Sequence, residues 1–299
     1  MKKIAIIGGG SVGLLFTAYL SKKFDVMLYT RTKEQAQAIR REGLSLVNKG
    51  AVQRIEVQAH PLSEGIFDAD LVVIAVKQYH MEDVLSAVDP QLKKDVPLLF
   101  VQNGMGHIHK IKESKYKHVL LGIVEHGALK NGENEIHHKG IGATKIACYR
   151  GDDRYIEELL ERQIDFFPFI QEENWYGMLV TKLVVNACIN PLTALYRVTN
   201  GQLVENSFYQ QNLQVVFKEV AEALNLIDAS SYWTKVINIC RQTALNRSSM
   251  LRDIEERRET EIEAILGYVL QEARSRDVST PSLNFLYKSI KGMEKRGGG

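Results

Sequence analysis

The sequence is poor in the features from which disulfide-bonded, metal-binding and membrane-spanning proteins are built. It contains three cysteines in 299 residues, and this odd, widely spaced set argues against a disulfide framework and indicates a reducing compartment. They are Cys148, Cys188 and Cys240. The pair His137 and His138 lacks a third ligand at a useful spacing, so no metal site is expected. No apolar run approaches the roughly 20 residues that a transmembrane helix needs, so no membrane partner is expected.

A strong charge of either sign is also missing. The formal net charge is +2 at pH 7, too small to indicate nucleic acid or an anionic membrane as a partner. The composition, 45% hydrophobic and 25% charged, is that of an ordinary globular protein, and 299 residues suffice for two domains with a core each. The apolar start indicates a strand rather than a signal peptide, because glycines interrupt it at once. We expect a cytoplasmic protein.

The chain begins with an apolar strand, a glycine turn and a helical pattern. This order is the context that a dinucleotide-binding motif requires. Gly8 permits the sharp turn, Gly10 lets the backbone approach a pyrophosphate, and Gly13 lets the helix pack closely on the strand. The phosphates would meet the first N–H groups of the helix and its positive dipole end. A purely structural glycine loop is the alternative, and the flanking pattern disfavours it. The predicted contacts of the turn with the cofactor are Gly8, Gly10, Ser11, Val12 and Gly13.

The second strand ends at Arg31, where an NAD site usually carries an acidic residue for the ribose hydroxyl. A planar guanidinium suits a 2′-phosphate instead, with Lys33 close by. The alternative is that both cations solvate the start of the next helix. Because the acid is absent and a base takes its place, the sequence favours NADP(H).

Strands alternate with helices over the first half of the chain, which predicts a doubly wound sheet. Continuous apolar runs at residues 71–76 and 97–101 indicate central parallel strands, buried on both faces. Segments 118–124, 135–138 and 144–149 are expected as antiparallel additions at the sheet edge. After residue 172 every pattern is helical, including one helix over 253–276. The prediction is an α/β Rossmann-type domain over 1–172, an all-α domain over 173–296 and a flexible tail over 297–299.

Polar residues end the two central strands. Lys77 follows the first, and Asn103 follows the second. Ligands of an open parallel sheet bind beyond the carboxyl ends of its strands. Any strand must end in something polar, but two such ends beside a nucleotide turn favour a role at the nicotinamide end of a cofactor.

A second polar feature lies in the helical half. Between Lys182 and Asn190 the polar residues are Lys182, Asn186 and Asn190, each four positions from the next. At helical spacing they form one stripe on an otherwise apolar helix. A surface stripe is the alternative, but a surface helix would be polar over a broader arc. The pattern therefore favours a substrate cleft.

A carboxylate is expected on a core-facing stripe of the predicted helix over 253–276. Glu261 falls four residues before Ile265 on that stripe, where it needs a partner or a cleft, and Lys182 is the candidate partner. Asp253 with Glu256 is expected to form a capping box for the same helix. The histidines are expected to be non-catalytic.

Taken together, these motifs identify the chain as similar to the ketopantoate reductase family over nearly its whole length. The motifs are Gly8 to Gly13, Val76-Lys77-Gln78, Gln102 to Gly106, Lys182 to Ala194, Ser248 to Leu251, and Thr260-Glu261-Ile262. The resemblance implies NADPH-dependent reduction of 2-dehydropantoate to (R)-pantoate, a step towards pantothenate and coenzyme A. It implies that Lys182 is the general acid and that Glu261 is the second catalytic or substrate-orienting residue.

The resemblance also implies roles for the other polar positions. The substrate would contact Asn103, Asn186, Asn190, Asn200 and Ser249. Lys77 and Asn103 would position the nicotinamide and the reacting carbonyl, and Arg31 would bind the 2′-phosphate. Two alternatives stay open: an NADPH-dependent reductase of another small 2-keto acid, and a non-catalytic NADP-binding regulator, which the presence of Lys182 and Glu261 disfavours. The sequence leaves the oligomeric state open, a homodimer included.

Overall fold

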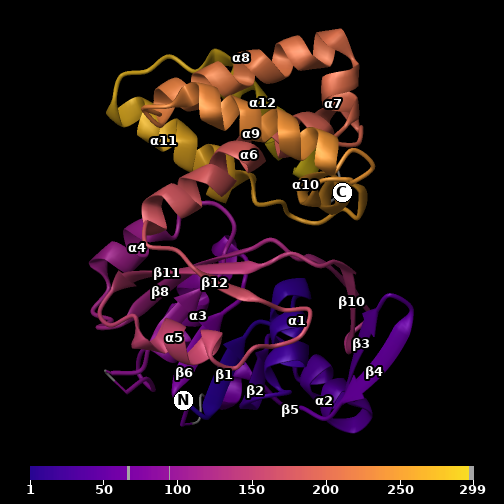
Figure 1. The fold of residues 1–299 in the computed structure, drawn as a ribbon, viewed down its shortest axis with the longest axis vertical. Coiled ribbons are helices and arrows are strands. Elements are labelled where there is room, and N and C mark those ends of the chain that lie inside the picture. The colour runs from indigo at the N-terminus through magenta and orange to yellow at the C-terminus, as the bar shows by residue number, and fades with distance from the viewer. Residues whose placement is uncertain (66–67, 94, 296–299) are drawn as a thin grey trace. The chain divides into compact units, whose positions relative to one another are not determined.

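The computed structural model describes residues 1–65, 68–93 and 95–295. Its contacts divide the chain into two compact units (Figure 1). The sheet unit comprises residues 1–102 and 110–178, and the helical unit comprises residues 103–109 and 179–299. The predicted fold class, a doubly wound α/β domain followed by an all-helical one, is confirmed. The predicted tail over 297–299 lies outside the described residues.

The sheet unit is built on a large twisted sheet. Within the described residues it has eight strands in the order β12-β11-β8-β7-β6-β1-β2-β5. All neighbours are parallel except β8 and β11. The strands are β1 (Lys3–Ile7), β2 (Asp25–Thr30), β5 (Gln58–Pro61), β6 (Leu71–Ile74), β7 (Leu98–Phe100), β8 (Val119–Val124), β11 (Thr144–Arg150) and β12 (Phe169–Gln171).

The strand order reverses between β1 and β6. From β1 the chain proceeds outwards through β2 and β5, and it then crosses to β6 and proceeds the other way through β7 and β8. Loops on either side of such a switch point diverge and leave a crevice at the carboxyl ends of the strands. The glycine turn follows β1 and Lys77 follows β6, so the topology brings both to this crevice.

A smaller sheet covers the helix that follows the glycine turn. Its order is β4-β3-β10-β9, with strands β3 (Leu44–Asn48), β4 (Ala51–Ile55), β9 (Gly127–Asn131) and β10 (Glu135–Gly140). Helix α1 (Ser11–Leu20) packs on β1 and β2 on one side and on β3, β9 and β10 on the other. This is why α1 is apolar nearly all round and buried from Gly13 onward.

Two expectations for the sheet edge were wrong. Strand β8 is parallel to β7, not antiparallel, and the segment expected at 135–138 belongs to the small sheet. Only β11 runs antiparallel to its large-sheet neighbour β8, as predicted. The reason is tertiary, because the second apolar face of α1 needs a cover and β10 supplies it. Short elements unforeseen in the sequence are β5, β9, β12, α4 (Ile108–Glu113) and α7 (Gln202–Glu205).

Helices complete the sheet unit. Thr32 caps α2 by accepting from the backbone N–H of Gln35, and Gly43 ends it at φ 73°. Both ends follow the usual capping preferences. The helices are α2 (Lys33–Glu42), α3 (Met81–Val88) and α5 (Arg154–Leu160), with single turns at Leu62–Glu64 and Gln78–His80.

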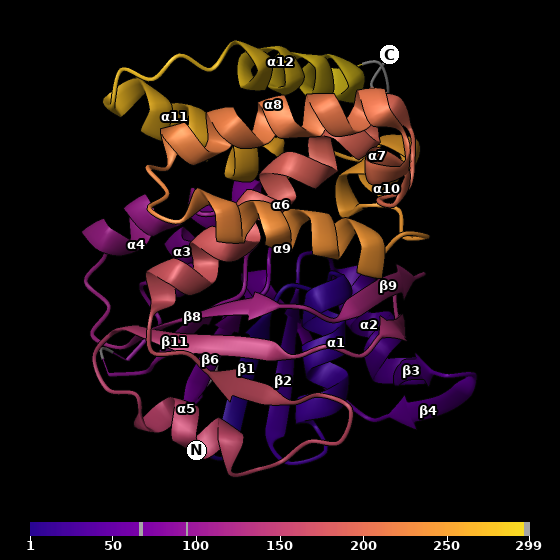
Figure 2. The same ribbon diagram turned by 45° about the horizontal axis from the view of Figure 1, so that its top comes forward.

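Most of α6 (Trp175–Tyr196) belongs to the helical unit. Helix α8 packs on both α11 and α12, and both views show α8 alongside α12 (Figure 2). The other helices are α8 (Ser207–Ala223), α9 (Ala229–Gln242), α10 (Ser249–Glu255), α11 (Tyr268–Ser275) and α12 (Pro281–Lys295).

The single helix expected over 253–276 is two helices. Helix α10 ends at Glu255, a non-helical stretch follows, and a π-helical turn at Glu263–Gly267 leads into α11. The predicted capping box is wrong as well. Ser248 is the N-cap of α10, and Asp253 is buried inside that helix, where it accepts from Arg258 Nε at 3.0 Å.

By length and composition, α6 is the one helix among the described residues that could cross a membrane. The apolar window that passes this test is 72% buried inside the protein. A helix covered by its own protein to this extent is typical of a soluble core.

Candidate functional site

The glycine turn has the backbone geometry that the motif predicts. Gly8 adopts φ +118°, and a Cβ there would lie 2.6 Å from the carbonyl oxygen of Ala75. A Cβ on Gly13 would lie 1.8 Å from the carbonyl oxygen of Gly8, so α1 meets the turn too closely for any side chain. At Gly10 no atom lies within 4 Å of a built Cβ. The turn is therefore closed towards the sheet and open at the position assigned to the pyrophosphate.

Two polar side chains brace this turn. Gln35 of α2 is buried, and its Nε2 donates to the carbonyl of Gly9 at 2.9 Å and to that of Glu133 at 3.0 Å. Ser11 Oγ accepts from the backbone N–H of Lys130 in β9 at 3.3 Å. Gln35 was missed in the sequence, because nothing in a helical pattern shows which polar residue turns inward. The first N–H groups of α1, including those of Ser11 and Val12, have no intrahelical carbonyl and suit an anion.

Arg31 lies directly after β2 and is exposed. Its Nη1 lies 3.2 Å from Nε2 of His80, which follows β6. Both residues therefore stand beyond the carboxyl ends of strands on either side of β1. The guanidinium retains further N–H donors for a ligand, since one of its five is directed at the imidazole.

The carboxyl ends of β6 and β7 are tied together by a residue to which no role was assigned. Gln102 is buried and its Nε2 donates to the carbonyl of Ile74 at 2.7 Å, while its Oε1 is buried without a hydrogen-bond partner among the described residues. Lys77, half-buried, begins the turn after β6. The hydrogen bond from Gln102 fixes where the chain leaves the sheet after β7, and it therefore fixes the position of Asn103.

Within the helical unit, Asn103 meets Glu261. Asn103 Nδ2 donates to Glu261 Oε2 at 2.9 Å. The approach depends on Gly104, at φ +76°, where a Cβ would lie 2.1 Å from the carbonyl oxygen of Ala264. That same carbonyl accepts from the backbone N–H of Met105 at 3.2 Å. A π-helical turn frees a carbonyl for such a contact, and these turns are frequent at functional sites.

Glu261 does not sit on the apolar face of a continuous helix, as was expected. It precedes the π-helical turn, and its carbonyl accepts from the N–H of Ile265 at 3.1 Å. Its side chain is half-buried. The hydrogen bond from Asn103 satisfies part of its carboxylate, and pairing of Glu261 with Lys182 stays a prediction.

The polar stripe of α6 leads from partly accessible positions to a buried one. Lys182 and Asn186 are half-buried, whereas Asn190 is buried. Most of the other positions from Met178 to Ala194 are buried. The stripe thus starts at a partly accessible position of a core helix and ends at a buried one. This arrangement is expected of a binding site and not of a solvated surface.

A hydrogen-bonded link ties this helix to α10. The hydroxyl of Thr193 lies 2.9 Å from the carbonyl of Ile189 and 2.8 Å from Ser248 Oγ. Ser248 Oγ accepts in turn from the N–H of Leu251 at 3.0 Å. Ser248 is therefore occupied as a cap, and the neighbouring Ser249 is exposed at the first position of α10.

The side chain of Asn200 is hydrogen-bonded within the helical unit. Its Nδ2 donates to Thr243 Oγ1 at 2.8 Å, and its Oδ1 is buried with no hydrogen-bond partner in the described part of the chain. An unsatisfied buried carbonyl oxygen is costly, and a ligand donor is one way of satisfying it.

Other titratable groups are unsuited to proton transfer at neutral pH. Burial lowers the pKa of His107 and that of His126 to about 4, so both imidazoles are neutral. Burial likewise raises the pKa of Cys240 to about 12 and raises the pKa of Cys188, so neither thiol is reactive. Within residues 1–65, 68–93 and 95–295, no three His, Cys, Asp or Glu side chains are grouped to hold a metal ion.

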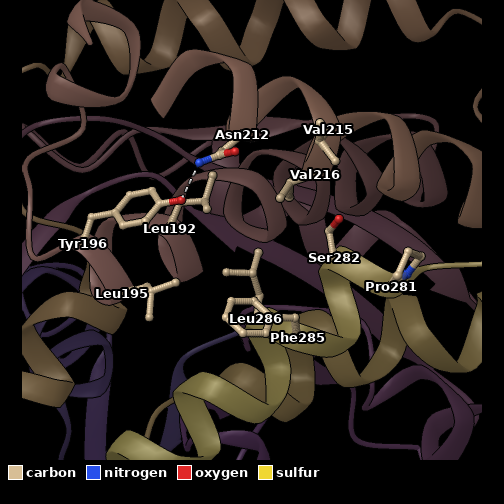
Figure 3. A pocket seen from close by; sticks show the side chains of 10 residues that line it. All are labelled: Leu192, Leu195, Tyr196, Asn212, Val215, Val216, Pro281, Ser282, Phe285 and Leu286. Atoms are coloured by element: carbon tan, nitrogen blue, oxygen red, sulfur yellow. Dashed lines mark hydrogen bonds between the residues drawn. The ribbon is translucent and has the colours of Figure 1, made fainter. Parts of the chain in front are cut away.

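Two hollows in the helical unit contain none of the predicted site residues. One is an apolar groove of about 380 Å³ between α6, α8 and α12, where Asn212 Nδ2 donates to the hydroxyl of Tyr196 at 2.9 Å (Figure 3). The other, of about 470 Å³, is lined by arginines. Concavity alone does not identify the site of chemistry here.

The fold and the turn define a dinucleotide-binding protein with a helical second unit. Two family models match it: "Ketopantoate reductase PanE/ApbA" over residues 4–151 and "Ketopantoate reductase PanE/ApbA C terminal" over residues 174–294. The chain belongs to the ketopantoate reductase family, and the resemblance inferred from its motifs is confirmed.

Relatives and solved structures agree with this assignment. The chain is 42% identical to the 2-dehydropantoate 2-reductase of Bacillus subtilis, over 98% of both chains, and 36% identical to that of Listeria innocua, over 97% and 96%. The crystal structure of the probable Bacillus subtilis enzyme matches with a TM-score of 0.90 at 41% identity, covering 97% of this chain and 99% of that one. A D-mandelate dehydrogenase with NADH matches with a TM-score of 0.91 at 22% identity, covering 99% of each chain, which shows the shared fold alone.

Proposed function

We propose that the protein reduces 2-dehydropantoate to (R)-pantoate with NADPH. The observation that carries the proposal is the stripe of Lys182, Asn186 and Asn190, a cation and two amides on a helix that is otherwise buried. Its relatives at 42% and 36% identity are 2-dehydropantoate 2-reductases. A small keto acid with a carboxylate and one hydroxyl group suits this combination of a positive charge and amide hydrogen-bonding groups.

The residues of the sheet unit fit the cofactor. The turn at Gly8, Gly10 and Gly13 is closed on its sheet side and open at Gly10, where the backbone can meet a pyrophosphate. We assign the 2′-phosphate to Arg31 and the nicotinamide end to Lys77. NADPH, when bound, supplies the hydride for the carbonyl carbon of the substrate.

The helical unit supplies the proton and the substrate contacts. Lys182 donates a proton to the oxygen of the reacting carbonyl as negative charge develops on it, a general-acid role. Asn186, Asn190, Asn200 and Ser249 hold the carboxylate and hydroxyl groups of the keto acid. Glu261 orients Asn103 through their 2.9 Å hydrogen bond, which directs the rest of that amide at the ligand. We regard the accessible end of the α6 stripe as the substrate side.

We further propose that the protein works in the cytoplasm as a homodimer. Its three cysteines are free, which suits a reducing compartment. A Staphylococcus aureus ketopantoate reductase, 22% identical over 99% of this chain, is described as dimeric. Sedimentation equilibrium would measure the mass in solution, and a single species of 33.8 kDa would contradict the dimer.

The deciding experiment follows the absorbance of NADPH with the purified protein and 2-dehydropantoate. NADH replaces the cofactor and 2-oxoisovalerate replaces the substrate in matched reactions. Fast oxidation only with NADPH and 2-dehydropantoate is the expected result. Faster turnover of 2-oxoisovalerate would move the function to another 2-keto acid, and bound NADPH without any turnover would move it to a binding role.

A further inference from the structure

The second hollow of the helical unit is a basic cavity that the proposed reaction does not use. It has a volume of about 470 Å³ and is lined by the last turns of α6 and α10, by residues just after them and by the end of α12. Its lining residues are Leu195, Arg197, Ile254, Arg257, Arg258, Met293 and Glu294. We call it the arginine cavity. Three guanidinium groups thus share one hollow with three aliphatic side chains.

Backbone conformation makes two of these arginines unusual. Arg197 and Arg257 have φ of 57° and 55°, in the left-handed region that favours glycine. Each is the left-handed residue of a helix end at which the next N–H bonds to a carbonyl five residues back, from Val198 to Thr193 and from Arg258 to Asp253. Glycine is the usual residue at this position of such a helix end.

The same helical unit contains two further helix ends of this kind, which provide an internal comparison. Leu226 N–H bonds to the carbonyl of Ala221, and Val278 N–H to that of Ala273. The left-handed positions there are Asn225 and Asp277, with φ of 50° and 56°. Asn and Asp tolerate this conformation better than other side chains do. The two ends that line the cavity instead carry arginine, at a conformational cost that neither glycine nor asparagine would impose.

The charges around the cavity leave these two arginines uncommitted. Arg258 is paired with Asp253 and Glu256. The carboxylate of Glu294 is taken up by Lys291 at 2.7 Å and by the hydroxyl and N–H of Thr260 at 2.6 and 2.9 Å. Arg257 donates its backbone N–H to the carbonyl of Ile254 at 3.2 Å, but among the residues that the structure describes the guanidinium groups of Arg197 and Arg257 make no hydrogen bond or ion pair. Two exposed guanidinium groups therefore remain for an anion.

We propose that the arginine cavity binds a small phosphate ester, with the phosphate held by Arg197 and Arg257. Guanidinium forks match phosphate oxygens in a bidentate manner. The volume exceeds that of a bare phosphate, and Leu195, Ile254 and Met293 offer an apolar wall to an aliphatic body. A basic residue near a helix end also interacts favourably with the helix dipole, without any ligand. The experiment must separate these two roles.

The backbone geometry provides a clean test, because glycine relieves the strain at both positions. The variant R197G/R257G should fold, and N225G/D277G is the matched control at equivalent positions away from the cavity. Calorimetric titration with n-butyl phosphate and with inorganic phosphate, at constant ionic strength set by chloride, measures binding to each protein. Amide hydrogen exchange locates it.

The expected result has three parts. Wild type and control bind butyl phosphate alike, and R197G/R257G binds it at least about tenfold more weakly. Butyl phosphate protects amides at 197–198 and 254–258, and it binds more tightly than inorganic phosphate. Equal affinity in all three proteins, or protection confined to the glycine turn, would overturn the site. Equal affinity for the two probes would overturn the assignment to an ester.

Discussion

The two units build their candidate sites from different materials. In the sheet unit the site is mostly backbone: a turn in which Gly8 and Gly13 exclude any side chain and the N–H groups of α1 are presented to a ligand. In the helical unit the site is made of side chains, which project from α6, from α10 and from the stretch before the π-helical turn. A backbone site is damaged by adding atoms, and a side-chain site by removing them.

The comparison has a physical basis. A pyrophosphate carries its charge on many oxygens and is well served by N–H groups and a helix dipole. A carbonyl that is to be reduced needs one proton donor at one atom, a role that suits a titratable side chain.

Removing the proton donor of the helical unit should have the largest effect. Lys182→Ala should lower turnover by roughly 100- to 10,000-fold while NADPH binding is retained, because general-acid help is worth about that much. Stopped-flow oxidation of NADPH measures turnover, and fluorescence titration measures NADPH binding. Lys218→Ala, an exposed lysine of α8, is the control. Near-normal turnover in Lys182→Ala would remove that residue from the chemistry.

Adding one methyl group should break the backbone site. Gly13→Ala places a Cβ 1.8 Å from the carbonyl oxygen of Gly8 and should destabilise the sheet unit by about 3 kcal/mol. Gly10→Ala meets no atom within 4 Å, so it should leave the free energy of unfolding nearly unchanged and weaken NADPH binding alone. Urea unfolding followed by circular dichroism distinguishes the two. Equal stabilities would contradict the close approach of α1 to the turn.

Acid should destabilise the sheet unit through a buried histidine pair. His126 Nδ1 lies 3.1 Å from His138 Nε2, and His138 Nδ1 lies 2.6 Å from the hydroxyl of Tyr19 in α1. Burial lowers the pKa of His126 from 6.5 to about 4 and also lowers that of His138. Between these pH values the unfolded chain binds the proton and the folded chain does not. The stabilisation is therefore complete above pH 6.5 and is lost as the pH falls towards 4.

The slope of this loss can be measured. For His126 the free energy of unfolding should fall by about 1.4 kcal/mol per pH unit, or by roughly 3 kcal/mol in total. His126→Phe keeps a ring to stack on Phe167, which lies 4.4 Å away between ring centroids, and it should remove that part of the slope. Free energies of unfolding from pH 7 to pH 4.5 provide the comparison. An unchanged slope would show that other groups cause the acid sensitivity.

Arg31 is the side-chain exception in the sheet unit. Arg31→Ala should raise the Michaelis constant for NADPH by roughly 10- to 100-fold, the value of a charged hydrogen bond, and that for NADH very little. Arg40→Ala, an exposed arginine in the last turn of α2, is the control. Steady-state kinetics with NADPH and with NADH measures both Michaelis constants. Equal effects of Arg31→Ala on the two constants would contradict the assignment of the 2′-phosphate to Arg31.

The smallest effect separates two neighbouring serines. Ser248 caps α10, so Ser248→Ala should cost about 1 kcal/mol of stability. Ser249 is exposed and makes no such cap, so Ser249→Ala should leave stability alone and raise the Michaelis constant for the keto acid. Thermal unfolding and substrate titration on both variants check this. A stability loss in Ser249→Ala would assign that residue to the fold.

Much of the molecule could be predicted from the sequence where the signal is local. The glycine spacing predicted the turn, and apolar runs predicted β6 and β7. The four-residue spacing of Lys182, Asn186 and Asn190 placed them on one stripe, because a helix repeats every 3.6 residues. Each of these depends only on neighbours along the chain.

Tertiary structure alone decided the rest. The small sheet forms because α1 is apolar on two faces, which no pattern within β10 reveals. Helix periodicity continued through residues 256–262, yet the chain leaves the helix there, with Arg257 left-handed and Thr260 bound to Glu294 of α12. Gln35 reaches the glycine turn from α2, and Gly104 brings Asn103 to Glu261. These contacts join residues between 26 and 158 positions apart. The energies of these contacts depend on which surfaces meet in the folded chain, and local sequence patterns do not reveal which surfaces those are.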